Sequence, residues 1–314
     1  NYPQGYCLYQ WNSKPALEIC SNAGLEKRDF QMKNRTEVFL STIPGQHGAW
    51  SVLIACFLIG TLSPGRFNSV SVIFLISLLS AFLGRHTLSE SLKLPASSSG
   101  RKNLLSWFGA YLAVFMITGV VLVWGFGRWL LIPLGLVSFL IMALSLYIDI
   151  QDKGFSLLGQ ISGIFGLSLV VPSAEYTASG TYSLRTFGLW IVCLLFFMGS
   201  VFYVRYLVRR RQEAGGPLFK RLRAGIHPLI FHLTMFLVSM GLAKVEILPS
   251  LIPLALVPAN LKVLRSIGCG YKKPPAIRQI GLRELFHILV FLLIVVLAFR
   301  IQGVPLAPSA IKVF

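Results

Sequence analysis

Apolar stretches of close to twenty residues recur along the chain from Ala49 onward, with short polar breaks between them. A helix needs about twenty such residues to cross the ~30 Å hydrocarbon core of a bilayer. Nine stretches fit this description: 49–64, 67–84, 104–126, 129–147, 155–176, 186–206, 226–245, 247–262 and 284–301. Only 13% of the residues are charged, which is far below the proportion in a soluble domain. The sequence therefore predicts an all-α, polytopic transmembrane helical bundle of about nine spans.

The apolar stretches divide the chain into three parts. Residues 1–42 are polar and predict an extramembrane N-terminal arm, residues 43–302 form the transmembrane helical domain, and residues 303–314 form a C-terminal tail. Three prolines interrupt the eighth stretch, which we expect to be bent, tilted or partly re-entrant: Pro249, Pro253 and Pro258. A chain that begins at Asn1 without a leader has either lost a presequence or starts inside a longer product.

The chain is strongly basic, with 29 Lys and Arg residues against 11 Asp and Glu. In a soluble protein this excess would suggest nucleic acid, but here the cations lie between apolar stretches, so the expected partners are membrane lipids and other membrane subunits. With nine spans, the loops on the N-terminal side carry 18 cations and the opposite loops carry 6. The positive-inside rule therefore places the N-terminus on the cytoplasmic or stromal side of an inner, plasma or thylakoid-type membrane.

Three cationic connections are long in this interpretation: 85–103, 205–225 and 263–283. The first two follow the second and sixth helices, which suggests two related halves. Because polar loops over an intramembrane cavity are where membrane proteins place their chemistry, we expect any site on this side, which we name the basic face.

All five histidines fall at helix ends on the basic face: His47, His86, His227, His232 and His287. An imidazole is amphipathic and is stable at the membrane–water interface, so these positions can be explained without any functional role. The functional alternatives are proton transfer, contact with an anionic or quinone-like head group, and haem or metal ligation. Nothing in the sequence selects a histidine pair, so haem is not expected.

Carboxylates are scarce, and two of them are close in sequence. Asp149 and Asp152 could share a helix face and hold magnesium together with substrate phosphates. A solvated loop is the simpler interpretation of this pair. We therefore expect neither magnesium nor another metal. Glu284, beside Arg283, resembles an interface anchor. The arginine-rich run 205–223 can attract phosphate groups, but it is also typical of any cationic loop that stays on the cytoplasmic side of a membrane.

The candidate ligand-binding residues are the histidines and the charged groups of the basic face: His47, Arg85, His86, Glu90, Asp149, Asp152, Arg209, His227, His232, Arg283 and His287. No catalytic residue is identified. The five cysteines lack the spacing of a metal or redox site and are expected to be unpaired. Cys56 and Cys193 lie inside apolar stretches and should be buried.

Three motifs together resemble the YwiC-like family of integral membrane proteins. They are Pro44-Gly-Gln-His-Gly-Ala-Trp50, then Ser156-Leu-Leu-Gly-Gln-Ile-Ser-Gly163 with Val171-Pro-Ser-Ala174, and finally Ile277-Arg-Gln-Ile-Gly-Leu-Arg-Glu-Leu285. The resemblance covers about residues 43–302. Gln46 stands where the family more often has Glu.

That family is distantly similar to the UbiA intramembrane prenyltransferases, which have nine helices and an active site under the loops after helices two and six. This resemblance implies a pocket for a prenyl or phosphorylated lipid, or a quinone. The transferases hold magnesium and diphosphate with Asp-rich motifs at both loops, whereas the corresponding acids here are Glu90 and Glu213. Without a metal clamp the departing diphosphate is poorly stabilised, so any enzyme here would be a degenerate prenyltransferase at most.

Three functions therefore compete. The first is a UbiA-like lipid-pocket protein with its site on the basic face. The second is a non-catalytic subunit or assembly factor of a respiratory or photosynthetic electron-transfer complex. The third, a small-solute transporter, ranks last because such proteins carry Gly or Pro breaks in both halves, whereas proline is concentrated in the eighth stretch.

Overall fold

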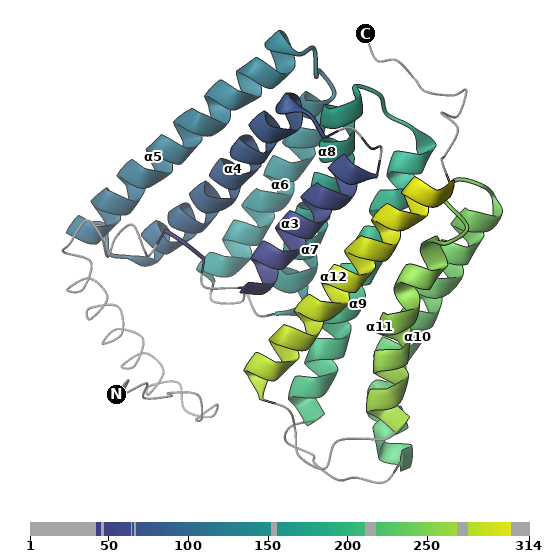
Figure 1. Ribbon diagram of the computed structural model, residues 1–314. Coiled ribbons are helices and arrows are strands. Elements are labelled where there is room, and N and C mark those ends of the chain that lie inside the picture. The colour runs from purple at the N-terminus through teal and green to yellow at the C-terminus, as the bar shows by residue number, and fades with distance from the viewer. Residues whose placement is uncertain are drawn as a thin grey trace, which may run out of the picture. The chain divides into compact units, whose positions relative to one another are not determined.

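The structure, a computed structural model, describes residues 42–44, 47–63, 65, 67–151, 156–210, 218–268 and 276–302 (Figure 1). These residues form α3 (His47–Leu62), α4 (Ser69–Lys93), α5 (Ser99–Val120), η1 (Val121–Gly125), α6 (Leu131–Ile150), α7 (Leu157–Ser168), α8 (Val170–Ser179), α9 (Leu184–Arg210), α10 (Leu218–Lys244), α11 (Ile252–Gly268) and α12 (Ile277–Gln302). The all-α prediction is confirmed. Most of the predicted arm, the tail, Asp152 and Glu213 lie outside the described residues, as do Cys7, Cys20 and Cys269.

Seven helical segments are long and apolar enough to cross a membrane: 69–93, 99–125, 131–150, 157–179, 184–208, 222–244 and 278–302. The protein is therefore a polytopic integral membrane protein. The predicted spans 49–64 and 247–262 also form helices, α3 and α11, but these are only 16 and 17 residues long. The proline-rich eighth segment becomes helical only from Ile252, so Pro249 precedes α11, Pro253 lies in its first turn, where a missing N–H is harmless, and Pro258 lies inside the helix.

The predicted long loops of the basic face are wrong in extent. α4 continues to Lys93 and α5 begins at Ser99, so most of 85–103 is helical. Likewise α9 reaches Arg210 before α10 begins at Leu218, and α11 reaches Gly268 before α12 begins at Ile277. The reason is that hydropathy measures preference for lipid, whereas Lys, Arg and Glu are good helix formers. These helices therefore extend past their apolar stretches.

The segment 157–179 has an irregular turn at Leu169, between α7 and α8. Pro172 has no N–H to donate to the carbonyl of Ser168, which explains why the helix is interrupted there. The Ser168 hydroxyl donates to the Phe165 carbonyl at 2.8 Å and accepts the indole N–H of Trp190 on α9 at 2.9 Å. The irregular turn is thus tied to the neighbouring helix.

The chain divides into two compact units, and the described part of the first comprises residues 42–44 and 79–115. Within it, the second half of α4 packs closely on α5, because a Cβ at Gly84 would lie 3.4 Å from the Cβ of Tyr111. The Tyr111 and Thr42 hydroxyls are hydrogen-bonded at 3.2 Å. Leu94 and Leu104 form a small buried cluster next to Trp107.

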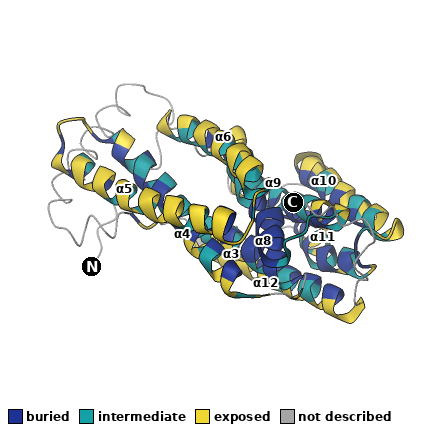
Figure 2. Ribbon diagram, turned by 90° about the horizontal axis from the view of Figure 1, so that it is seen from above, coloured by how far each residue is buried: buried dark blue, intermediate teal, exposed yellow. Residues whose placement is uncertain are grey.

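The second unit contains the remaining helices, and its core is α8, in which every residue from Val170 to Ala178 is buried (Figure 2). α3 approaches α8 at Gly60, where a Cβ would lie only 2.5 Å from the carbonyl oxygen of Val171, so the contact requires glycine. Farther along, α9 and α12 meet at Phe196 and Phe291, whose rings are stacked with centroids 3.9 Å apart. Cys56 and Cys193 are free and buried, as predicted.

Candidate functional site

A buried ion pair joins α11 to α12 in the second unit. The Lys262 ammonium donates to both carboxylate oxygens of Glu284 at 2.9 Å, and the Ser200 hydroxyl on α9 donates to Oε2 at 2.7 Å. The side chains of Lys262 and Glu284 are only 7% and 12% exposed. The Lys262 ammonium also lies over the ring of Tyr203, 4.6 Å from its centroid. We name these four residues the Lys262 cluster.

Burial makes this arrangement costly unless each charge is well paired, since charges inside a membrane protein need a partner or a water-filled cavity. The Glu284 carboxylate accepts three hydrogen bonds, two from the Lys262 ammonium and one from the Ser200 hydroxyl, and Lys262 adds a cation–π contact. The cluster therefore fixes α9, α11 and α12 relative to one another.

His232 lies next to this cluster and is 2% exposed. Its Nδ1 is 2.8 Å from the carbonyl oxygen of Pro228, one turn earlier on α10. A Cβ at Gly199, the residue before Ser200, would lie 3.2 Å from Cε1 of the imidazole. His232 is thus packed against α9 in the interior, and not at an interface as the sequence alone suggests.

Toward the basic face, α10–α12 carry a set of exposed cations that we name the cationic collar: Arg223, Arg265, Arg278 and Arg283. His227, also exposed, and His287, half-buried with Nδ1 2.6 Å from the Arg283 carbonyl, lie on the same helices. In the described residues of α9–α12, Glu284 is the only acid, and Lys262 neutralises it. The collar therefore keeps a net positive charge.

The remaining predicted site residues are distributed elsewhere. Arg85, His86 and Glu90 lie on α4 in the first unit, where Glu90 is paired with Lys93 at 3.1 Å. Asp149 lies in the last turn of α6. His47 is the first residue of α3 and Arg209 is in the last turn of α9, with side chains outside the described part of the structure. Within the described residues, no three His, Cys, Asp or Glu side chains form a metal-binding group.

Sequence reasoning missed Lys262 and Ser200 and misinterpreted Glu284. The interpretation of Glu284 as an interface anchor is wrong, because its carboxylate faces α9 and α11. The available signal was a lone acid in an apolar helix together with a lone Lys near the end of another apolar stretch. Such charges inside a membrane usually pair, but the sequence does not say which cation is the partner.

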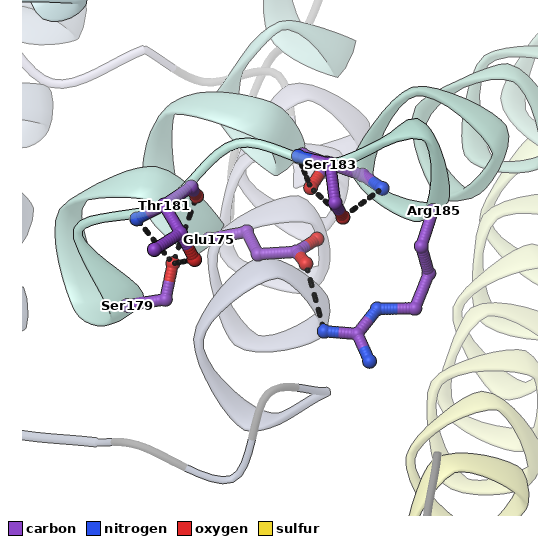
Figure 3. Close-up of polar contacts among 6 residues, drawn as sticks. Glu175, Ser179, Thr181, Ser183 and Arg185 are labelled. Carbon is purple, nitrogen blue, oxygen red and sulfur yellow. Dashed lines mark hydrogen bonds and ion pairs between the residues drawn. The ribbon is translucent and has the colours of Figure 1, made fainter. Parts of the chain in front are cut away.

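A second buried ion pair lies near the opposite end of α9 (Figure 3). Glu175 on α8 accepts from Nη2 of Arg185 at 3.4 Å, and the carboxyl side chain is 3% exposed. Within the described residues, its second oxygen, Oε2, is buried without a hydrogen-bond partner. The Arg185 guanidinium also lies 5.6 Å from the ring centroid of Phe299 on α12.

Comparison with known proteins supports the motif-based resemblance. The model of the family described as "YwiC-like protein" matches residues 43–175. A curated relative, "Uncharacterized protein YwiC" of Bacillus subtilis (strain 168), is 26% identical over 208 residues, which are 66% of this chain and 82% of the relative. No solved structure matches the chain. The resemblance to the YwiC-like family is therefore confirmed over residues 43–175, which contain the first two motifs but not Ile277–Leu285, and the protein is a polytopic membrane protein with YwiC-like sequence over that range.

Proposed function

We propose that this protein binds the anionic head group of a membrane lipid, a phosphate or diphosphate on a prenyl or acyl chain, at the cationic collar of α10–α12. The observation that carries the proposal is the charge balance of these helices. The described part of α9–α12 carries the four exposed arginines of the collar and one acid, Glu284, which Lys262 neutralises. The described residues of α9–α12 therefore present an excess of positive charge to an anion that approaches the collar.

Arginine suits this role because its planar guanidinium matches two oxygens of a phosphate at once. Each juxtamembrane cation contributes about 1 kcal/mol of attraction to an anionic membrane surface. The four arginines are exposed on three helices, so more than one guanidinium is available to a phosphorylated head group at this end of the unit. The positive-inside rule places this face in the cytoplasm or its stromal equivalent.

The proposal is for binding without prenyl transfer. A magnesium–diphosphate complex is held by carboxylates, and Glu284, the acid of α9–α12, is already bonded to Lys262 and Ser200. The UbiA-like pocket that the resemblance implies would therefore serve here to hold the lipid.

The second candidate is a non-catalytic subunit of an electron-transfer complex. The observation that favours it is the apolar surface of α6, where Leu136, Phe139 and Leu140 are about three-fifths exposed, at 60%, 58% and 60%. Lipid covers such a surface equally well, so this candidate depends on finding a partner subunit.

Native mass spectrometry of protein extracted in mild detergent separates the two candidates. Titration with phosphatidic acid and with farnesyl diphosphate should give bound adducts, whereas diacylglycerol and farnesol should not. The double variant Arg265→Gln/Arg283→Gln should weaken adduct formation about tenfold, equivalent to ~1.4 kcal/mol. Lys244→Gln is the matched control, because Lys244 is exposed at the other end of α10.

Equal binding of the charged and neutral lipids would overturn the proposal, as would equal loss in the Lys244→Gln control. Co-purification of defined membrane subunits without phosphorylated lipid would favour the second candidate.

A further inference from the structure

The Glu175 carboxyl is the least satisfied buried charge in the described structure. We infer that Glu175 is a proton-binding site and that its ion pair with Arg185 is the deprotonated state. This inference is independent of the lipid-binding proposal, because the two sites lie at opposite ends of α9. Glu175, on α8, is near the first residues of α9, whereas the cationic collar lies on the parts of α10–α12 that are near the last residues of α9.

The contacts of the carboxyl group carry the inference. Its single ion-pair contact, Nη2 of Arg185 to Oε1, is long at 3.4 Å. The Thr186 hydroxyl lies close enough to interact with the carboxyl group, but Oε2 is buried and accepts no hydrogen bond of normal geometry from the described residues. The nearby hydroxyls also bond locally: Ser179 with Thr181 (Figure 3), and Ser183 with Thr186. A carboxylate with one unsolvated, unbonded oxygen is costly in an apolar segment, and adding a proton removes its charge.

Steric packing limits what else could bind to Oε2. This oxygen is buried from solvent, and α3 packs closely on the backbone of α8 at the same level, where a Cβ at Gly60 would lie 3.2 Å from the backbone nitrogen of Glu175. A metal cation needs several oxygen ligands around it, and the described residues offer no group of three acids, histidines or cysteines. A proton needs neither volume nor a ligand shell.

Apart from the cations Arg185 and Arg128, the titratable groups around Glu175 are neutral at physiological pH. On α9 the thiol of Cys193 interacts with Glu175, and Cys193 in turn lies near Cys56 on α3, with both thiols buried. In the connection 181–183, Tyr182 has its pKa raised by burial and, to a lesser extent, by the charge of Glu175, so its phenol stays protonated. Arg128 donates to the Thr177 carbonyl and lies over the Tyr176 ring, one residue along α8 from Glu175.

Protonation has a defined structural consequence. A proton from water adds to the carboxylate, the charge on Glu175 disappears, and the electrostatic attraction between α8 and α9 at Arg185 is lost. Arg185 keeps its contact with Phe299 and is 19% exposed, so its guanidinium remains partly solvated. Proton binding would therefore loosen the join between the two helices.

Infrared difference spectroscopy of the protein in membranes, between alkaline and acidic pH, tests this directly. A carbonyl stretching band of a protonated carboxylic acid should grow as the pH falls. The band should be lost in Glu175→Gln and kept in Glu246→Gln, because Glu246 is an exposed acid between α10 and α11. Absence of the band in the wild-type protein, or its survival in Glu175→Gln, would overturn the inference.

A second variant guards against misfolding of Glu175→Gln. Arg185→Gln retains Glu175 and removes its counter-charge, so at neutral pH its band should be several-fold stronger than in the wild-type protein. Labelling with dicyclohexylcarbodiimide, which takes the acid proton onto its nitrogen as the carboxyl oxygen bonds to its carbon, should then mark Glu175 in preference to Glu284. An unchanged band in Arg185→Gln would also contradict the proposed proton site.

Discussion

Two buried ion pairs in the second unit differ in how completely they are satisfied. Glu284 receives three hydrogen bonds, from Lys262 and Ser200, and joins α9, α11 and α12. Glu175 is buried more deeply, yet it has one long contact with Arg185 and one oxygen without a partner among the described residues. The number of hydrogen bonds to the carboxylate, and not its depth of burial, therefore distinguishes the two acids. Glu284 holds three helices together, whereas Glu175 is the acid that we infer to bind a proton.

The largest expected effect follows from breaking the satisfied pair. Glu284→Gln leaves the Lys262 ammonium buried over Tyr203 without its counter-charge, and removing one partner of a buried pair costs about 3–5 kcal/mol. Equilibrium unfolding in mixed micelles measures this loss. The double variant Lys262→Met/Glu284→Met should lose less than either single variant, because no unpaired charge remains. A loss below about 1 kcal/mol in the single variant would refute this role.

The next effect concerns the contact that encloses Glu175. Gly60→Ala adds a Cβ that would lie 2.5 Å from the Val171 carbonyl oxygen and 2.8 Å from the Cβ of Ala174, so α3 must move away from α8. Overpacking of this kind costs about 1–3 kcal/mol, measured by the same unfolding assay. The control is Gly163→Ala on α7, where an added Cβ meets nothing within 4 Å. Equal destabilisation by both variants would mean that the close approach is unimportant.

The sequence predicted the helices well because hydropathy directly reports preference for lipid. It predicted their ends poorly, as α4 shows, because cationic residues extend a helix as readily as apolar ones. It did not identify the Lys262 cluster, since Ser200, Lys262 and Glu284 come from three helices and only their packing brings them together. Glu175 was visible as a lone acid, but its unpartnered oxygen is a property of the packed structure.

The Ser200 hydroxyl on α9 gives Glu284 a hydrogen bond in addition to those from its counter-ion, and Glu175 has no equivalent bond. Ser200→Ala removes a 2.7 Å hydrogen bond to a charged acceptor and should destabilise the protein by about 1.5–3 kcal/mol. The matched control is Ser239→Ala on α10, where the buried hydroxyl donates to the Phe236 carbonyl of its own helix at 2.7 Å. The control should cost clearly less, because only a local bond within one helix is lost. If the two variants are equally stable, the hydroxyl of Ser200 contributes nothing specific to the pair.

The smallest effect is expected at the unsatisfied pair itself. Glu175→Gln keeps the shape of the side chain and removes one long ion-pair contact, while Arg185 remains partly exposed and stays over Phe299. A contact to a partly solvated guanidinium is worth about 0.2–1 kcal/mol, so the unfolding free energy should change by no more than this. Comparison with Glu284→Gln in one assay is decisive because both substitutions are isosteric. If Glu175→Gln costs as much as Glu284→Gln, the pair with Arg185 is a structural clamp, and a proton could not be exchanged there without loosening the fold as a whole.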